Sequence, residues 1–222
     1  MELYTYHRSV AAQRVRIALN LKGVAYESRF VDLSTQREEQ NHPRFRELNP
    51  QGLAPVLVDE GVVITQSLAI IEYLDERIRV RPLLPEAPLA RARVRSLAQL
   101  FAADMQPLTN LRVFDYLQET MGCDEAALDA WYEHWTMEGL EAAETLLSRS
   151  GEADGFCFGD QPTLADVCMV PQVHDATLRG YDLSGFPVLR GVYGNCMTLA
   201  SFQAAAPETQ PDAVAQRRPV AV

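Results

Sequence analysis

Residues 53–68 read LAPVLVDEGVVITQSL, a pattern of two short strands, a tight turn between them and the start of a helix. Residues 56–58 and 62–64 are runs dominated by β-branched side chains, which favour strands. Residues 59–61 (DEG) have the length and the glycine of a hairpin connection. Helical periodicity begins at Ser67. The sequence therefore predicts a hairpin that leads directly into a helix.

The preceding residues alternate strand and helix signals. Residues 3–6 and 26–31 are typical of strands, whereas residues 11–22 carry apolar side chains along one helical face. The polar run 34–48 is expected to be a loop with one turn or a short helix. Residues 1–80 are thus predicted to form an α/β domain with the element order β-α-β-β-β-α.

A proline-rich segment marks the predicted domain boundary near residues 80–88. Pro82, Pro85 and Pro88 cannot continue a helix, and strand patterns end before them. Residues 89–210 are predicted to form an all-helical domain. Its expected helices span residues 89–118, 124–149, 163–178 and 187–200.

Three local features refine the second half of the chain. Pro107 lies inside the first of these helices and should kink it. Thr163 and Asp166 have the spacing of a capping box at a helix start. The Ala- and Pro-rich residues after Ala206 lack apolar periodicity, so they are expected to be poorly ordered.

The composition excludes several classes of protein. The 222 residues include 20 basic and 30 acidic side chains, a formal charge of −10, which is the wrong sign for binding a nucleic-acid backbone. No run approaches the roughly 20 apolar residues that span a bilayer. The start MELYTYHR does not resemble a signal peptide. We therefore expect a cytoplasmic protein that binds neither nucleic acid nor membranes.

The four cysteines have no metal-binding or redox-motif spacing. Cys123, Cys157, Cys168 and Cys196 are irregularly spaced, with no C-x-x-C pair. We expect buried free thiols in a reducing compartment, and no metal site.

Two helix starts in the first domain carry polar side chains. Arg8 and Ser9 precede the first helix, and Gln66 and Ser67 open the helix after the hairpin. The N-terminus of a helix favours anions because its N–H groups are free and its dipole is positive there. The alternative is that Ser9 and Ser67 only cap their helices.

Pro55 enters a predicted strand, where a proline frequently adopts the cis form. The N–H and C=O groups of Ala54 would then point away from the sheet and could pair with a peptide ligand. A rigid turn without a ligand is the alternative. With the two helix starts, this free edge could hold an extended anionic peptide that bears a thiol.

The sequence resembles the zeta class of glutathione transferases over nearly its whole length. The resemblance rests on residues 7–23 (HRSVAAQRVRIALNLKG), 49–51 (NPQ), Pro55, 66–74 (QSLAIIEYL), 106–110 (QPLTN), 159–160 (GD), 170–173 (VPQV) and 210–212 (QPD).

This resemblance implies a thioredoxin-like N-terminal domain, a C-terminal helical bundle, glutathione as cofactor and a homodimer. Ser9 matches the serine that donates a hydrogen bond to the glutathione sulfur. The implied glutathione-binding residues are Gln66 and Ser67 at the γ-glutamyl carboxylate, Ala54 and Pro55 at the cysteinyl unit, Gln51 at the glycyl end, and Gln106 and Asn110 facing the cleft.

The resemblance further implies cis–trans isomerisation of maleylpyruvate or maleylacetoacetate. A thiol with a pKa near 8.5 is mostly protonated at neutral pH, and lowering that pKa by about two units stabilises the thiolate by about 2.7 kcal/mol. Such small-molecule substrates are anionic, so Arg8 and Arg112 are candidate substrate-binding residues. Arg112 as an exposed surface residue is the alternative. Arg14 and Arg16 are expected to support structure or a dimer surface.

The sequence departs from the family pattern at two places. Val10 and Ala11 replace a serine and a cysteine, and Leu178 stands where the family has a substrate-binding arginine, with Arg179 one residue later. A one-residue shift turns a helical side chain by roughly 100°. The alternatives are therefore a glutathione transferase or dehalogenase acting on small electrophilic acids, and a non-catalytic glutathione-binding module.

Overall fold

The computed structural model describes residues 1–34 and 38–216, which belong to two compact units. Unit 1 contains Met1–Pro82 and the residues from Thr198 onward, and unit 2 contains Leu83–Met197. Residues 198–210, expected in the helical domain, therefore belong to unit 1. The sequence could not show this, because it depends on bonds between carbonyl oxygens of this segment and side chains of the first helix.

Unit 1 contains a four-stranded sheet with the strand order β2-β1-β3-β4. β1 pairs with β2 in parallel and with β3 antiparallel, and β3 pairs with β4 as the predicted hairpin. Each strand has four residues. The strands are β1 (Glu2–Thr5), β2 (Glu27–Phe30), β3 (Val56–Asp59) and β4 (Val62–Thr65).

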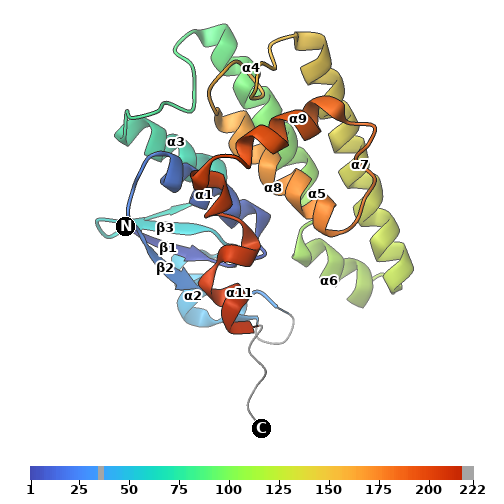
Figure 1. The fold of residues 1–222 in the computed structure, drawn as a ribbon. Coiled ribbons are helices and arrows are strands. Elements are labelled where there is room, and N and C mark those ends of the chain that lie inside the picture. Colours follow the sequence, from blue (N-terminus) through green and yellow to red (C-terminus); the bar gives the residue numbers. More distant parts are fainter. Residues whose placement is uncertain (35–37, 217–222) are drawn as a thin grey trace. The chain divides into compact units, whose positions relative to one another are not determined.

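Helices cover both faces of this sheet (Figure 1). Leu3 and Leu57 are paired in register and fully buried on one face. Tyr4 and Val56 point to the other face, where Phe45 packs against them. The helices of this part are α1 (Val10–Leu21), α2 (Pro43–Leu48), which follows a 3₁₀ turn (Glu39–Asn41), and α3 (Ser67–Arg77). Residues 35–37 of the predicted loop lie outside the described residues.

The prediction of a poorly ordered tail after Ala206 is wrong for residues 207–216. The segment from Thr198 forms α10 (Ala200–Gln203), a 3₁₀ turn (Pro207–Thr209) and α11 (Pro211–Gln216). Hydrogen bonds to residues near the start of α1 and within it hold this segment in place. Such bonds do not require a periodic pattern of apolar residues in the sequence. Residues 217–222 lie outside the described part of the chain.

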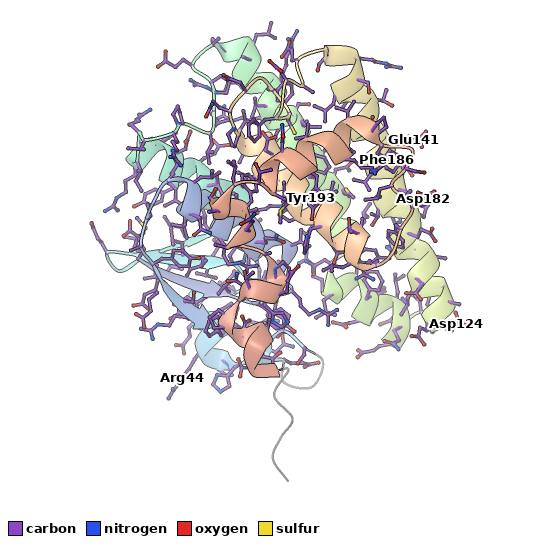
Figure 2. All side chains as sticks on the ribbon, in the orientation of Figure 1. Arg44, Asp124, Glu141, Asp182, Phe186 and Tyr193 are labelled. Carbon is purple, nitrogen blue, oxygen red and sulfur yellow. The ribbon has the colours of Figure 1, made fainter. Side chains whose placement is uncertain are left out.

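Unit 2 is helical, as predicted. α8 is its central helix: most of its side chains are buried, and it packs against α4 and α9. The ring Nδ1 of His174 on α8 lies 2.7 Å from the hydroxyl of Tyr193 on α9 (Figure 2). The elements are α4 (Pro88–Gln99), a π-helical turn (Leu100–Met105), α5 (Gln106–Leu108), α6 (Leu111–Glu119), α7 (Glu125–Ser150), α8 (Leu164–Leu178) and α9 (Pro187–Cys196).

The helix predicted over residues 89–118 is interrupted rather than simply kinked at Pro107. Before the proline, the N–H of Gln106 bonds to the carbonyl of Phe101, five residues back, which is a π-helical bond. After it, the backbone leaves the helix, and Asn110 caps the new helix α6. Pro107 has no backbone N–H to donate to the preceding helical turn, and its ring needs extra space there. The wider π turn before it and the break after it both accommodate these two properties.

The predicted capping box at the start of α8 is confirmed. The fully buried carboxylate of Asp166 accepts hydrogen bonds from the N–H and the hydroxyl of Thr163, each at 2.8 Å. It also accepts from the N–H of Cys157 at 2.7 Å. One side chain thus fixes both the helix start and the loop before it.

Candidate active site

Ser9 occupies the N-cap position of α1. Its hydroxyl oxygen accepts a hydrogen bond from the N–H of Ala12 at 3.2 Å, and its backbone is extended with φ −74° and ψ 110°. A hydroxyl that accepts at its oxygen still has its proton to donate. Capping and thiolate binding are therefore compatible, and they need not be alternatives at this position.

The N-terminus of α3 has an unusual start. Gln66 holds the cap position with φ 69° and, among the described residues, makes no side-chain hydrogen bond to the helix. Ser67 is the first helical residue and is buried, so it is not the N-cap. A helix start without a side-chain cap leaves N–H groups that an anion can bind.

A buried cation lies behind this helix start. Nη1 of Arg14, which is almost fully buried on α1, lies 3.5 Å from the hydroxyl oxygen of Ser67. The sequence suggested only a structural or dimer-surface role for Arg14. Its position five residues after Ser9 on the same helix was the available signal, but only the packing of α1 against α3 brings it to Ser67.

One further predicted residue of unit 1, Gln51, contacts the side chain of Gln66. The amide nitrogen of Gln66 donates to the side-chain oxygen of Gln51 at 2.7 Å. The bond between Ala54 and Pro55 is cis, which confirms that prediction. Ala54 lies two residues before Val56, at which β3 begins to pair with β1 and β4. The structure thus brings Gln51 and the start of α3 together beside the cis proline.

The predicted residues of unit 2 lie at the break between α5 and α6. Gln106 begins α5, and the side-chain oxygen of Asn110 accepts from the N–H of Arg112 at 3.2 Å as the cap of α6. Arg112 is exposed in the first turn of α6, which agrees with its interpretation as a surface residue. Asn110 therefore has a capping contact that sequence reasoning did not assign.

Two sequence-family models match this chain. The model described as "Glutathione S-transferase, N-terminal domain" matches residues 8–77, and the corresponding C-terminal domain model matches residues 125–195. The chain belongs to the glutathione transferase family. A probable maleylacetoacetate isomerase from Vibrio cholerae is 45% identical, with 95% of this chain and 97% of that protein aligned. A maleylpyruvate isomerase from a Ralstonia species is 44% identical, covering 96% and 99% of the two chains.

Solved structures give the same class. The holo structure of a maleylpyruvate isomerase, a bacterial glutathione transferase of the zeta class, matches with a TM-score of 0.92 and 44% identity, covering 96% of this chain and 99% of that one. A maleylacetoacetate isomerase from Methylobacterium extorquens AM1, with bound malonate and glutathione, matches with a TM-score of 0.93 and 41% identity over the same shares. The chain is a zeta-class transferase with the predicted fold.

In this zeta-class chain, Arg179, which follows Leu178 at the end of α8, already has two partners. Its Nε donates to the carboxylate of Asp175 at 3.0 Å, and its guanidinium carbon lies 3.5 Å from the ring centre of Tyr132. Tyr132 donates its hydroxyl to the same carboxylate at 2.7 Å. Burial raises the pKa of Tyr132, so this hydroxyl stays protonated. The charge of Arg179 is thus already compensated within unit 2.

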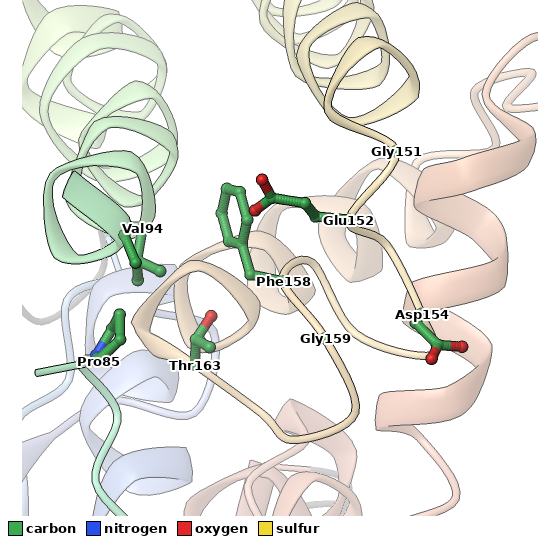
Figure 3. Close-up of a pocket in the computed structure, with 9 residues that line it drawn as sticks. Pro85, Val94, Gly151, Glu152, Asp154, Phe158, Gly159 and Thr163 are labelled. Atoms are coloured by element: carbon green, nitrogen blue, oxygen red, sulfur yellow. The ribbon is translucent and has the colours of Figure 1, made fainter. Parts of the chain in front are cut away.

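A cavity of about 410 Å³ lies in unit 2. Figure 3 shows the ring of Phe158 beside Glu152, with Pro85, Val94 and Thr163 along the wall. Its walls are mostly apolar and include none of the predicted site residues.

The cysteines are free thiols, as predicted, although Cys123 is only half-buried. Burial raises the pKa of the thiols of Cys157 and Cys196, which keeps both protonated. Within residues 1–34 and 38–216, His, Cys, Asp and Glu side chains form no group of three or more that could bind a metal. Nor does this described part contain a helix with the length and apolarity needed to cross a membrane.

Proposed function

We propose that this protein is a glutathione-dependent cis–trans isomerase of maleylpyruvate or maleylacetoacetate. Relatives of the same class, 44–45% identical over nearly the full length, carry these names. The residues expected to bind glutathione are present, and three of them in unit 1 are adjacent or in contact, namely Gln51, Gln66 and Ser67. Both facts support the proposal.

The observation that carries the proposal is the start of α3 without a side-chain cap, with Arg14 behind it. A free carboxylate such as that of the γ-glutamyl unit fits a helix start of this kind. Ser67 adds a hydroxyl donor there, and the exposed side chain of Gln66 adds an amide. The chain's own residues thus provide the donors that an anionic peptide requires.

Ser9 is proposed to bind the sulfur of glutathione. Its hydroxyl proton is free to bind a sulfur anion, and the positive end of the α1 dipole lies beside it. When bound, glutathione supplies a thiolate that adds reversibly to the cis double bond, so that rotation and elimination give the trans isomer. Arg8, exposed next to Ser9, is proposed to bind a substrate carboxylate. Gln106, Asn110 and Arg112 remain proposed contributors from unit 2.

A second candidate is a transferase or dehalogenase that acts on small electrophilic acids. Leu178 is exposed at the end of α8, and Arg179 already pairs with Asp175. A substrate with two carboxylates would therefore lack one of the cations that the family pattern supplies. A substrate with one carboxylate needs only one cation.

An assay of the purified protein with glutathione tests the proposal. We expect maleylpyruvate or maleylacetoacetate to lose its cis-enone absorbance while the free-thiol concentration stays constant. Ser9→Ala should lower kcat/KM by about 100-fold, the scale of losing one essential donor. No turnover of either acid, together with glutathione-dependent release of chloride from dichloroacetate, would favour the second candidate.

We further propose a cytoplasmic homodimer. The free cysteines fit a reducing compartment such as the cytoplasm.

The edge strand β4 supports the dimer. Val62 and Val63 are exposed on this strand, a position that proteins usually cover or make polar. Light scattering should give twice the chain mass of 24.8 kDa, and a monomeric mass would contradict the dimer.

A further inference from the structure

The motif at residues 210–212 (QPD) has no role in the function proposed above, yet it is firmly held. Gln210 is buried, and its amide donates to the carbonyl oxygens of Ala204 at 2.8 Å and Ala206 at 3.0 Å. These bonds fold the segment back on itself just before α11. Asp212 follows in the first turn of that helix, so the motif fixes the position of one carboxylate.

The carboxylate of Asp212 holds His7, two residues before Ser9. Its Oδ2 accepts from the backbone N–H of His7 at 2.7 Å and lies 3.1 Å from Nδ1 of the ring. The two side chains are only 12% and 9% exposed. A carboxylate oxygen accepts hydrogen bonds, so Nδ1 is the protonated ring nitrogen here. Oδ2 of Asp212 thus holds both the backbone and the ring of His7.

Arg16 holds the same turn from the carbonyl side. It is fully buried and donates to the carbonyls of Tyr6 and His7, each at 3.1 Å, and twice to that of Ala205. Burial lowers its pKa to about 10, which still leaves it charged at neutral pH. The C-terminal segment therefore holds this turn in two ways. Asp212 contacts His7 directly, and the carbonyl of Ala205 binds Arg16, which in turn binds the carbonyls of Tyr6 and His7.

The turn that is held in this way carries Ser9. The N–H of Ser9 donates at 3.1 Å to the carbonyl of Tyr6, the same oxygen that Arg16 binds. Hydrogen bonds weaken steeply when the donor direction changes. The direction of the Ser9 hydroxyl thus depends on how residues 6–8 are fixed.

We propose that Asp212 is a positioning residue for Ser9: through His7 it fixes the turn so that the serine hydroxyl points at the glutathione sulfur. The inference rests on the proposed function, because it concerns the same thiolate. Asp212 acts through His7 at the start of α1, whereas the proposed γ-glutamyl contacts lie at the start of α3. Its loss should therefore raise the pKa of the bound thiol and leave most of the binding energy intact.

The test compares Asp212→Asn with wild type and with the control Asp182→Asn. Asp182 also accepts a backbone N–H, that of Ser184 at 2.9 Å, but it lies between α8 and α9 in unit 2 (Figure 2). Ultraviolet absorbance of the thiolate, titrated against pH in the complex with glutathione, gives the thiol pKa. Calorimetry with S-methylglutathione measures binding without the thiol.

In Asp212→Asn we expect the thiol pKa to rise by about one unit, a tenfold change in the ionisation constant. The Kd of S-methylglutathione should change less than about twofold, and Asp182→Asn should match wild type in both measurements. An unchanged thiol pKa in folded Asp212→Asn overturns the inference. So does a loss of S-methylglutathione binding as large as the loss of glutathione binding.

The thiol pKa of glutathione bound to the wild-type protein distinguishes failure of the proposed function from failure of the role of Asp212. If its bound glutathione has the thiol pKa of free glutathione, the proposed function fails. If the wild-type thiol pKa is lowered and Asp212→Asn leaves it lowered, only the role of Asp212 fails. Should circular dichroism show that Asp212→Asn is unfolded, Asp212→Glu decides, because it keeps the charge but moves the carboxylate relative to the N–H and the ring of His7, and an unchanged thiol pKa there overturns the inference.

Discussion

Nη1 of Arg14 lies 3.5 Å from the hydroxyl oxygen of Ser67, and both residues are buried where α1 packs against α3. A cation at this point adds to the positive potential of the helix start. We expect Arg14→Gln to weaken glutathione binding by about tenfold, or about 1.4 kcal/mol, measured by calorimetry. Arg149→Gln, an exposed change on α7, is the control and should have no effect. An unchanged Kd in folded Arg14→Gln would contradict this prediction.

Lys22 forms a buried ion pair that closes the end of α3. Its Nζ lies 2.8 Å from Asp75 and also donates to the carbonyls of Ile78 and Val80. Removing one member of a buried pair leaves an uncompensated charge, so Lys22→Met should lower the free energy of unfolding by about 3–5 kcal/mol. Urea unfolding measures this change.

The control for Lys22 is Arg29→Gln, which removes an exposed cation that pairs with Glu2 and Glu27 on the same sheet. Exposed pairs contribute about 0–1 kcal/mol, so this variant should unfold nearly as wild type does. Equal stability of the two variants would show that the buried pair contributes no more than the exposed one.

Glu144 of α7 caps α9 from outside the helix. Its two carboxylate oxygens accept from the N–H groups of Val188 at 3.0 Å and Leu189 at 2.9 Å. Glu144→Ala leaves these donors unsatisfied and should cost about 1–3 kcal/mol in urea unfolding. Glu141→Ala, one turn earlier and exposed (Figure 2), should change stability by less than about 0.5 kcal/mol. A similar loss in both variants would argue against the cap.

The cysteines should differ sharply in reactivity. Cys157, Cys168 and Cys196 are buried, and burial raises the pKa of the first and the last, so neither forms a thiolate at neutral pH. Cys123 is half-buried. A thiol reagent should therefore label one cysteine in the native protein, none in Cys123→Ser, and all four after unfolding in wild type. Fast labelling of native Cys123→Ser would disprove the assignment.

Local patterns predicted the features whose causes are local. The hairpin of residues 56–64 depends on β-branched runs around a glycine turn, and the capping box depends on Thr163 and Asp166 three residues apart. The cis form of Pro55 was expected at the point where this proline enters a strand. The positions of Ser9 and Ser67 at helix starts followed from the same kind of signal.

Features that depend on tertiary contacts could not be predicted in this way. The role of Arg14 behind Ser67 requires the packing of two helices, and the order of residues 207–216 requires bonds to residues near the other end of the chain. The π turn before Pro107 resolves a conflict between helix continuation and a missing donor, and a periodicity pattern cannot show how that conflict is resolved.

The bonds of Arg16 to Ala205 join positions 189 residues apart in the chain. Unit 1 is thus built from both ends of the polypeptide, with all of unit 2 synthesised in between. During translation, these contacts can form only after all of unit 2 has been synthesised. An expressed fragment ending at Pro82 would lack them, whereas a circular permutant that joins the two ends and opens the chain at residue 82 would keep unit 1 in one continuous piece.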